Sequence, residues 1–162
     1  MNSIELRKFK EEDLSAAAEL WNSVIEAGDC FPGDKILSHD EITAMFAEQT
    51  EVVCAFIASE LVGLYILHPN GIGRLAHIAN ASYAVKDLHR GKGIGKTLVA
   101  DSIAKAKEKG FRGLQFNAVT AHNYGAIALY LKLGFKIIGT IAGGYRLARD
   151  KYQDTIIFLK TW

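Results

Sequence analysis

The chain has 162 residues, of which 49% are hydrophobic and 23% charged, and its formal net charge at pH 7 is +1. This length is sufficient for a compact unit with a full hydrophobic core, so we expect residues 1–162 to form a single domain. A net charge this close to zero gives no support for nucleic-acid or membrane binding through bulk electrostatics, and no apolar run approaches the ~20 residues that cross a bilayer.

The first predicted elements are a short strand and two helices. Alternating apolar residues predict a strand over 3–9, and helical spacing of apolar residues predicts a helix from Leu14. Residues 28–34 contain two glycines and a proline, which predicts a loop. Ser38 and Glu41 have the spacing of a capping box, so a second helix is expected to begin there.

Strands dominate the middle of the chain. Residues 52–58 and 61–68 are predicted as strands joined by a hairpin at Ser59 and Glu60. A turn at 69–73 then precedes a long strand over 76–85. A helix over 93–109, stopped by Gly110, and a strand over 113–119 follow.

A helix over 123–133 comes next, with Asn123 as a candidate N-cap and Gly134 as its stop. The last strands are expected over 135–141 and 155–160. The whole order is βααβββαβαββ, which predicts a mixed α/β fold.

The two cysteines and the N-terminal residues indicate the cellular compartment. Cys54 lies inside an apolar run and is expected to be a buried core thiol, whereas Cys30 lies in the loop without an activating His or a metal-ligand partner. No disulfide framework or metal site is indicated. Because residues 1–10 are polar and lack the apolar core of a signal peptide, we expect a cytoplasmic protein.

A basic, glycine-rich turn opens the helix at residue 93. At a helix N-terminus the first N–H groups lack partners and the macrodipole is positive. Each cation there should therefore destabilise the fold by a few tenths to about 1 kcal/mol. Three cations in this turn are explained if a diphosphate binds there. The turn reads Arg90-Gly91-Lys92-Gly93-Ile94-Gly95-Lys96.

Other phosphate motifs fit less well. Gly95-Lys96-Thr97 is similar to the end of a P-loop, but that motif needs Gly where Arg90 stands. A dinucleotide-binding motif that begins at Gly91 would need Gly or Ala where Lys96 stands. The G-x-G-x-x-A match over 71–76 precedes a strand rather than a helix. A nucleotide-phosphate enzyme that uses Gly95-Lys96-Thr97 remains an alternative.

Two sequence blocks match one known family. The first is R-x-x-G-x-G, formed by Arg90, Gly93 and Gly95, and the second is N-x-x-A-x-x-L-Y-x-x-x-G-F over 123–135. With these blocks the chain resembles the GNAT superfamily of acyl-CoA-dependent N-acetyltransferases. The resemblance implies a mixed α/β (α+β) GNAT-like fold. Such a fold has a central, mostly antiparallel six- to seven-stranded sheet, about four helices and splayed central strands.

The resemblance also implies a cofactor site for acetyl-CoA. The glycine turn would hold the pyrophosphate, and backbone N–H groups at the end of the preceding strand would polarise the thioester carbonyl. Asn123 could bond the cofactor or simply cap its own helix. The implied cofactor residues are Tyr83, Ala84, Val85, Arg90, Gly91, Lys92, Gly93, Ile94, Gly95, Lys96, Asn123 and Ala126.

Catalytic and acceptor residues are assigned with alternatives. By resemblance Tyr130 is the general acid for the leaving thiolate; the alternative is a core aromatic. No Glu lies between residues 76 and 85 to act as base, and Glu26 and Asp29, near the loop over 28–34, are the other candidate proton acceptors. Asn80 and Asn117 cannot be bases, but could orient the substrate, hold a water or play a structural part. By position, Phe31 is expected to line the amine pocket.

These residues predict direct acetyl transfer from acetyl-CoA to an amine in a ternary complex, because no Cys or Ser has an obvious activating partner. The expected acceptor is a small amine or amino acid, with a protein N-terminus or lysine as the alternative. A non-catalytic acyl-CoA sensor is a further alternative. Family members are often dimers, so a homodimer is also expected from the resemblance.

Overall fold

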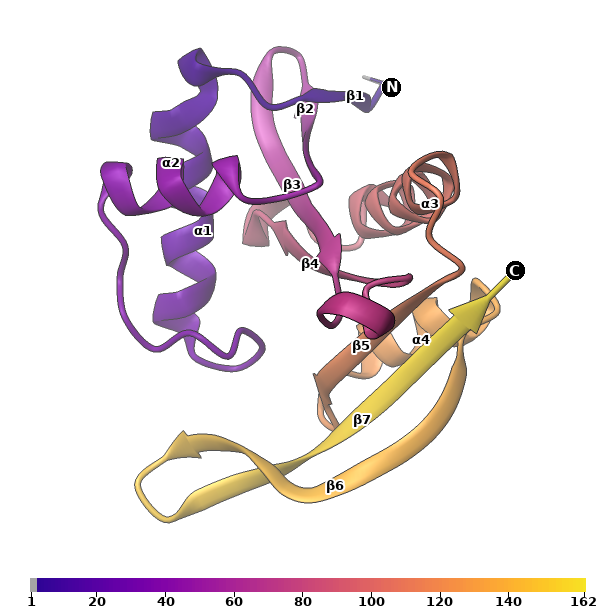
Figure 1. Ribbon diagram of the computed structural model, residues 1–162. Coiled ribbons are helices and arrows are strands. Elements are labelled where there is room, and N and C mark those ends of the chain that lie inside the picture. Colours follow the sequence, from indigo (N-terminus) through magenta and orange to yellow (C-terminus); the bar gives the residue numbers. More distant parts are fainter. Residues whose placement is uncertain (1–2) are drawn as a thin grey trace.

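The computed structural model describes residues 3–162 and forms one seven-stranded sheet with helices on both faces (Figure 1). The helices and strands follow the predicted order βααβββαβαββ. They are β1 (Glu5–Lys8), α1 (Leu14–Ala27), α2 (His39–Ala47), β2 (Glu51–Ile57), β3 (Glu60–Pro69), β4 (Ile78–Val85), α3 (Ile94–Glu108), β5 (Gly113–Thr120), α4 (Tyr124–Lys132), β6 (Lys136–Ala148) and β7 (Lys151–Thr161).

The sheet order is β1-β2-β3-β4-β5-β7-β6, and every neighbouring pair is antiparallel except β4 and β5. The parallel pair is joined at only two positions, Ile78 with Gly113 and Ala79 with Leu114. Beyond Ala79 the two strands separate. The expected mixed, mostly antiparallel sheet with splayed central strands is therefore confirmed.

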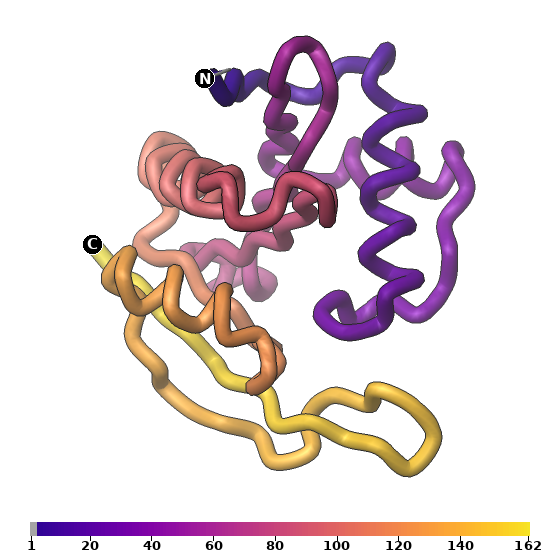
Figure 2. The backbone as a smooth tube through the Cα atoms, turned by 180° about the vertical axis from the view of Figure 1, so that it is seen from behind, coloured from indigo at the N-terminus to yellow at the C-terminus, as the bar shows by residue number. Residues whose placement is uncertain are grey.

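Two hydrophobic cores lie on opposite faces of the sheet. On the α3 and α4 face, Leu98, Tyr130 and Phe158 belong to one buried cluster that draws on strands from both sides of the β4–β5 gap. On the α1 and α2 face, the buried residues all lie between Ala17 and Ala84. Figure 2 shows the α3 and α4 side of the sheet. Packing across the gap is therefore concentrated on one face.

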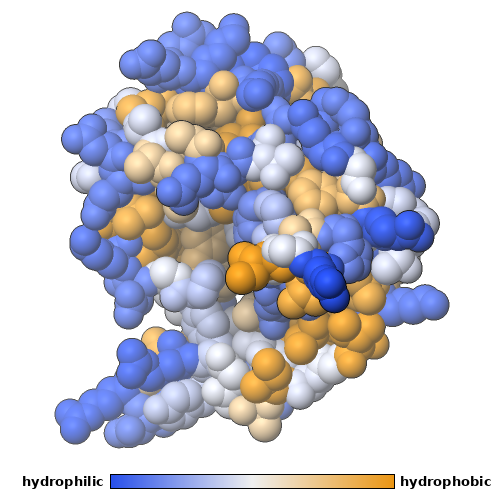
Figure 3. Space-filling model, viewed as in Figure 1, coloured by the Kyte–Doolittle hydropathy of each residue, from blue (hydrophilic) through white to orange (hydrophobic). Residues whose placement is uncertain are grey.

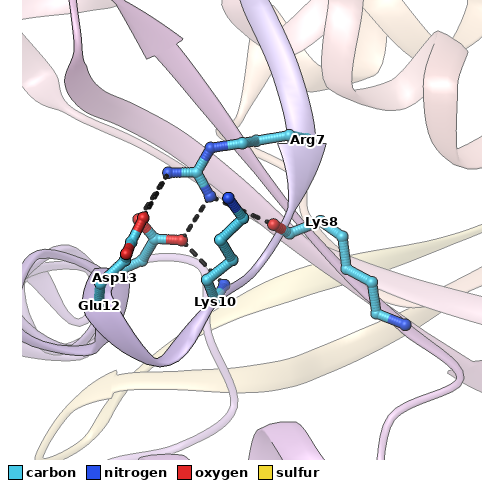
Figure 4. Close-up of polar contacts among 5 residues, drawn as sticks. All are labelled: Arg7, Lys8, Lys10, Glu12 and Asp13. Atoms are coloured by element: carbon cyan, nitrogen blue, oxygen red, sulfur yellow. Dashed lines mark hydrogen bonds and ion pairs between the residues drawn. The ribbon is translucent and has the colours of Figure 1, made fainter.

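A bidentate ion pair fixes the start of α1 to β1 (Figure 4). The Arg7 guanidinium donates to both carboxylate oxygens of Asp13, at 2.7 and 2.9 Å, and Asp13 also accepts from the Lys10 N–H at 2.9 Å. The hydrogen bonds from Arg7 hold the pKa of Asp13 below its ordinary value. Because Asp13 is 7% exposed, this pair is shielded from solvent more than an ordinary surface salt bridge.

Several local signals behave as predicted. The Ser38–Glu41 capping box is formed in both directions. Gly110 and Gly134 follow α3 and α4 with φ of 85° and 84°, which is the left-handed conformation of a helix stop. The β2–β3 turn is shifted by one residue, because Ala58 and Ser59 take positive φ and Glu60 already belongs to β3. The long strand β4 begins at Ile78 rather than at residue 76.

The final hairpin is much longer than predicted. The first of these strands was expected to end at 141 and the second to begin at 155. In the structure β6 extends to Ala148 and β7 already begins at Lys151. This arm is exposed along most of β6, and its register shifts between Ile141 and Tyr145. A strand exposed on both faces needs no alternation of apolar residues, so the sequence gives no period to detect. The tip is covered by hydrophilic side chains (Figure 3).

Candidate active site

The glycine turn before α3 has the backbone that an anion site requires. Gly91 and Gly93 have φ of 76° and 84°, and Gly93 is the N-cap of α3. A Cβ on either glycine would meet nothing within 4 Å. These glycines are therefore needed for their left-handed conformation and not to avoid a clash within the protein.

The N-terminus of α3 is open to an incoming ligand. Within residues 3–162, the backbone N–H groups of 91–96 have no hydrogen-bond acceptor, and the first turn of α3 holds no acidic residue. Asp87 pairs with the Arg90 Nε at 3.0 Å rather than with the helix end. Lys92 and Lys96 are exposed beside it. The local charges thus favour a phosphate-type anion.

Two cavities meet beside this turn. The larger, of about 760 Å³, extends from Arg90 and the glycines to the start of α4. The smaller, of about 370 Å³, lies between β4 and β5 under loop 28–34. Both are lined by Tyr83, Thr120, Tyr130 and two further residues, Cys30 and Asn123. The two cavities therefore adjoin, and Tyr130 is one of the residues on their shared boundary.

The end of β4 presents two backbone N–H groups to this space. Lys86 N–H donates to Val62 O and Asn70 N–H donates to Ile78 O, so the even-numbered residues of β4 pair with β3. The N–H of Ala84 therefore belongs to the β3 ladder. The N–H groups of Tyr83 and Val85 point to the opposite edge, where β5 has separated.

Tyr130 is both a core aromatic and a cavity residue. It is 9% exposed, and its ring centroid lies 4.5 Å from that of Phe116. Its hydroxyl has no hydrogen-bond partner within the described chain, although it lines both cavities. Burial, followed by the nearby Cys30, raises its pKa well above the usual value. The phenol is therefore protonated at neutral pH.

Asn123 caps α4, and its Oδ1 accepts the N–H of Ala126 at 3.3 Å. That N–H is thus already used by the protein. Both residues still line the larger cavity, next to the exposed Tyr124. Their predicted role in binding a cofactor is therefore supported by their position and not by a free donor from Ala126.

The predicted acceptor residues gather at the smaller cavity. Asn80 on β4 and Asn117 on β5 both donate to the Oδ1 of Asn70, at 3.1 and 2.7 Å. Phe31 is buried against Trp21, with ring centroids 4.5 Å apart, and its carbonyl accepts from the Tyr145 hydroxyl at 2.7 Å. A chain of neutral amides therefore lies opposite an aromatic wall.

Sequence reasoning missed two residues of this site. Asn70 was assigned only to a turn, and the register of β3 with β4 is what brings it beside the other two asparagines. Cys30 was given no role, yet it lies where the cavities meet. Burial raises its pKa to about 11, so the thiol is neutral at pH 7.

Among residues 3–162, no cluster of His, Cys, Asp and Glu has the composition of a metal site. No helix there combines the length and apolar character needed to cross a membrane.

A sheet that separates beside an open glycine turn, with a tyrosine at the junction of two cavities, is the architecture of an acyl-CoA-dependent transferase. The chain matches the Acetyltransferase (GNAT) family over residues 16–135. It is 32% identical to the N-acetyltransferase aca1 of Schizosaccharomyces pombe, over 93% of this chain and 81% of that protein. The chain belongs to the GNAT family and is an N-acetyltransferase.

Solved structures agree with this fold. A GCN5-related N-acetyltransferase from Kribbella flavida superimposes with a TM-score of 0.91 and 27% identity, over 98% of each chain. A phosphinothricin acetyltransferase from Sinorhizobium meliloti, solved with acetyl-CoA, gives a TM-score of 0.90 at 21% identity, over 98% of this chain and 88% of that chain.

Proposed function

We propose that this protein transfers the acetyl group of acetyl-CoA to the amine of a small molecule by direct attack in a ternary complex. One observation carries the proposal: the cavity beside the glycine turn adjoins a small pocket in the β4–β5 gap, and Tyr130 is one of the residues that line both. A thioester entering from one side and an amine from the other would come together there.

The cofactor would lie along the larger cavity. Its pyrophosphate would accept hydrogen bonds from the free N–H groups of residues 91–96. The side chains of Arg90, Lys92 and Lys96 would supply positive charge. Its thioester end would reach the N–H groups of Tyr83 and Val85. The phosphinothricin acetyltransferase of the same fold was solved with acetyl-CoA, which supports this assignment.

Acyl transfer then needs three events. The neutral amine attacks the thioester carbonyl, and the backbone N–H groups at the end of β4 stabilise the developing oxyanion. A C–N bond forms and the C–S bond breaks. The amine loses one proton, and the leaving thiolate gains one.

The raised pKa of Tyr130 constrains how it acts on that thiolate. Because this phenol is less acidic than a thiol, whose pKa is about 8.5, transfer of its proton to the thiolate alone is energetically unfavourable. We infer that Tyr130 passes its proton to sulfur while it receives the proton released by the attacking nitrogen. Phenolate then never accumulates, and the proton balance of the step closes within the site.

A thiol-release assay over a panel of amines, with the acetylated product identified by mass, tests the proposal. Release with a small amine is the expected result. Tight acetyl-CoA binding without release for any amine would instead identify a sensor. ATP binding that coenzyme A does not displace would support the nucleotide alternative. The cytoplasmic location, the single domain and the homodimer remain predictions.

A further inference from the structure

We propose that the acceptor carries an uncharged hydrogen-bonding group beside its amine, as an α-amino amide does, and neither a carboxylate nor a second cation. The proposal names the acceptor class for the site described above and rests on the proposed function. It follows from three features of the smaller cavity.

The first feature is the lack of formal charge. The residues that line the smaller cavity come from loop 28–34, β4, β5 and α4 with its N-cap, and none of them is Asp, Glu, Lys, Arg or His. A carboxylate or ammonium group entering this space would find no ionic partner among these residues, whereas a neutral polar group needs none. The lining therefore disfavours amino acids and diamines.

The second feature is the hydrogen-bonding capacity of the asparagine cluster. Asn80 and Asn117 each use one amide hydrogen on Asn70, which leaves each of them a second N–H donor. The Oδ1 of Asn117 accepts from Gln115 at 2.9 Å. The Oδ1 of Asn80 has no partner among residues 3–162 and remains an acceptor. A neutral amide, which both donates and accepts, satisfies this set, whereas a carboxylate only accepts.

The third feature is the lack of a base. Asp29 and His122 line the larger cavity, but no carboxylate or imidazole lines the smaller one. With no base lining the smaller cavity itself, an amine that is already largely neutral is favoured as the nucleophile there. An α-amine with a pKa of about 8 has roughly two orders of magnitude more free base at pH 7 than an alkyl amine with a pKa of about 10.4. An adjacent neutral amide is compatible with such an amine.

The test compares acceptors of one carbon skeleton: leucinamide, leucine and the diamine in which a CH₂NH₃⁺ group replaces the amide. Thiol release at pH 7.5 should give leucinamide a kcat/KM at least tenfold above each of the others. Higher kcat/KM for leucine or for the diamine overturns the proposal. A Leu-Gly-Gly tripeptide, which has the same amine and amide, shows whether the source is a small amide or a peptide N-terminus.

Two variants connect this preference to the asparagines. Asn80→Leu should raise the KM for leucinamide at least tenfold. It should also reduce the ratio of kcat/KM for leucinamide to that for the other two acceptors, with little change in acetyl-CoA affinity. Asn117→Asp adds a carboxylate and should raise kcat/KM for the diamine. Thermal unfolding shows that each variant is folded. If both folded variants keep the wild-type ratios of kcat/KM among the three acceptors, the proposal is wrong.

A binding measurement separates this inference from the proposed function. Leucinamide should raise the unfolding temperature of the coenzyme A-saturated protein, and leucine should not. If no amine releases thiol but leucinamide still gives a shift that Asn80→Leu abolishes, the recognition stands and the catalytic proposal falls. No leucinamide shift in the saturated wild-type protein overturns the inference.

Discussion

A Cβ atom on Gly63 of β3 would lie 3.0 Å from the Cγ2 of Ile94, the first residue of α3. It would also lie 3.2 Å from the carbonyl oxygen of Ala84 on β4. Both distances are shorter than ordinary van der Waals contact. The height of the glycine turn above the sheet therefore depends on a residue that belongs to neither family motif.

Gly63→Val should displace the first turn of α3 and reduce the affinity for coenzyme A. Overpacking of this kind costs about 1–3 kcal/mol of unfolding free energy. Calorimetric titration with coenzyme A and denaturant unfolding give the two quantities. Gly139→Ala is the control, because a Cβ there would lie 3.8 Å from Ile157. Unchanged affinity in a folded Gly63→Val protein would show that the turn does not rely on this contact.

Gly93→Ala and Gly110→Ala are a matched pair at the two ends of α3. Both glycines have φ near 85° and open space around the missing Cβ. Each substitution should cost about 1–2 kcal/mol of stability through the left-handed backbone. Only Gly93→Ala should weaken coenzyme A binding in titration calorimetry. Equal binding by the two variants would remove the phosphate role of the turn.

Tyr130→Phe should lower kcat by about 10²-fold, as expected for loss of a proton-transfer group, and leave acetyl-CoA affinity nearly unchanged. Tyr152→Phe, at an exposed tyrosine of β7, is the control. Because burial raises the pKa of Tyr130, the phenol stays protonated from pH 6 to 9. The wild-type rate should therefore show no alkaline decline in that range. Wild-type turnover in Tyr130→Phe would make the residue purely structural.

Cys30 should react slowly with iodoacetamide at pH 7, because burial raises its pKa to about 11 and the thiol is the inert form. Its rate should increase with pH up to that value. Saturating acetyl-CoA should protect it, since Cys30 lines the larger cavity. Cys54, fully buried with a pKa of about 12, is the internal control for unfolding. Labelling followed by mass spectrometry gives both rates, and rapid Cys30 labelling at pH 7 contradicts the prediction.

Asp13→Asn should reduce the free energy of unfolding by about 1–3 kcal/mol at pH 7. The pKa of Asp13 is depressed in the folded protein. Its contribution is therefore present above the unfolded pKa of about 3.9 and is lost as pH falls through the folded value. The variant and wild type should converge in acid. Denaturant curves from pH 7 to pH 3 measure this, and a pH-independent difference would rule out linkage through Asp13.

The order of elements was predictable because periodicity, caps and glycine stops are local signals. The arm of β6 and β7 was not, since strands exposed on both faces carry no such pattern. The role of Asn70 was hidden for another reason: only the pairing of β3 with β4 brings it to Asn80. The difference between Ala84 and its neighbours depends on which edge of β4 each N–H faces.

Because β4 and β5 share only two paired positions, few backbone hydrogen bonds join strands β1–β4 to strands β5–β7. An amide-containing cofactor arm lying in this gap would bridge the two strands. At one hundred times its Kd, such a ligand adds about 2.7 kcal/mol to stability. Amide hydrogen exchange in β5 and β7 should then slow along with that of β4. Loading the cofactor would therefore couple the opening of the two parts of the sheet more tightly.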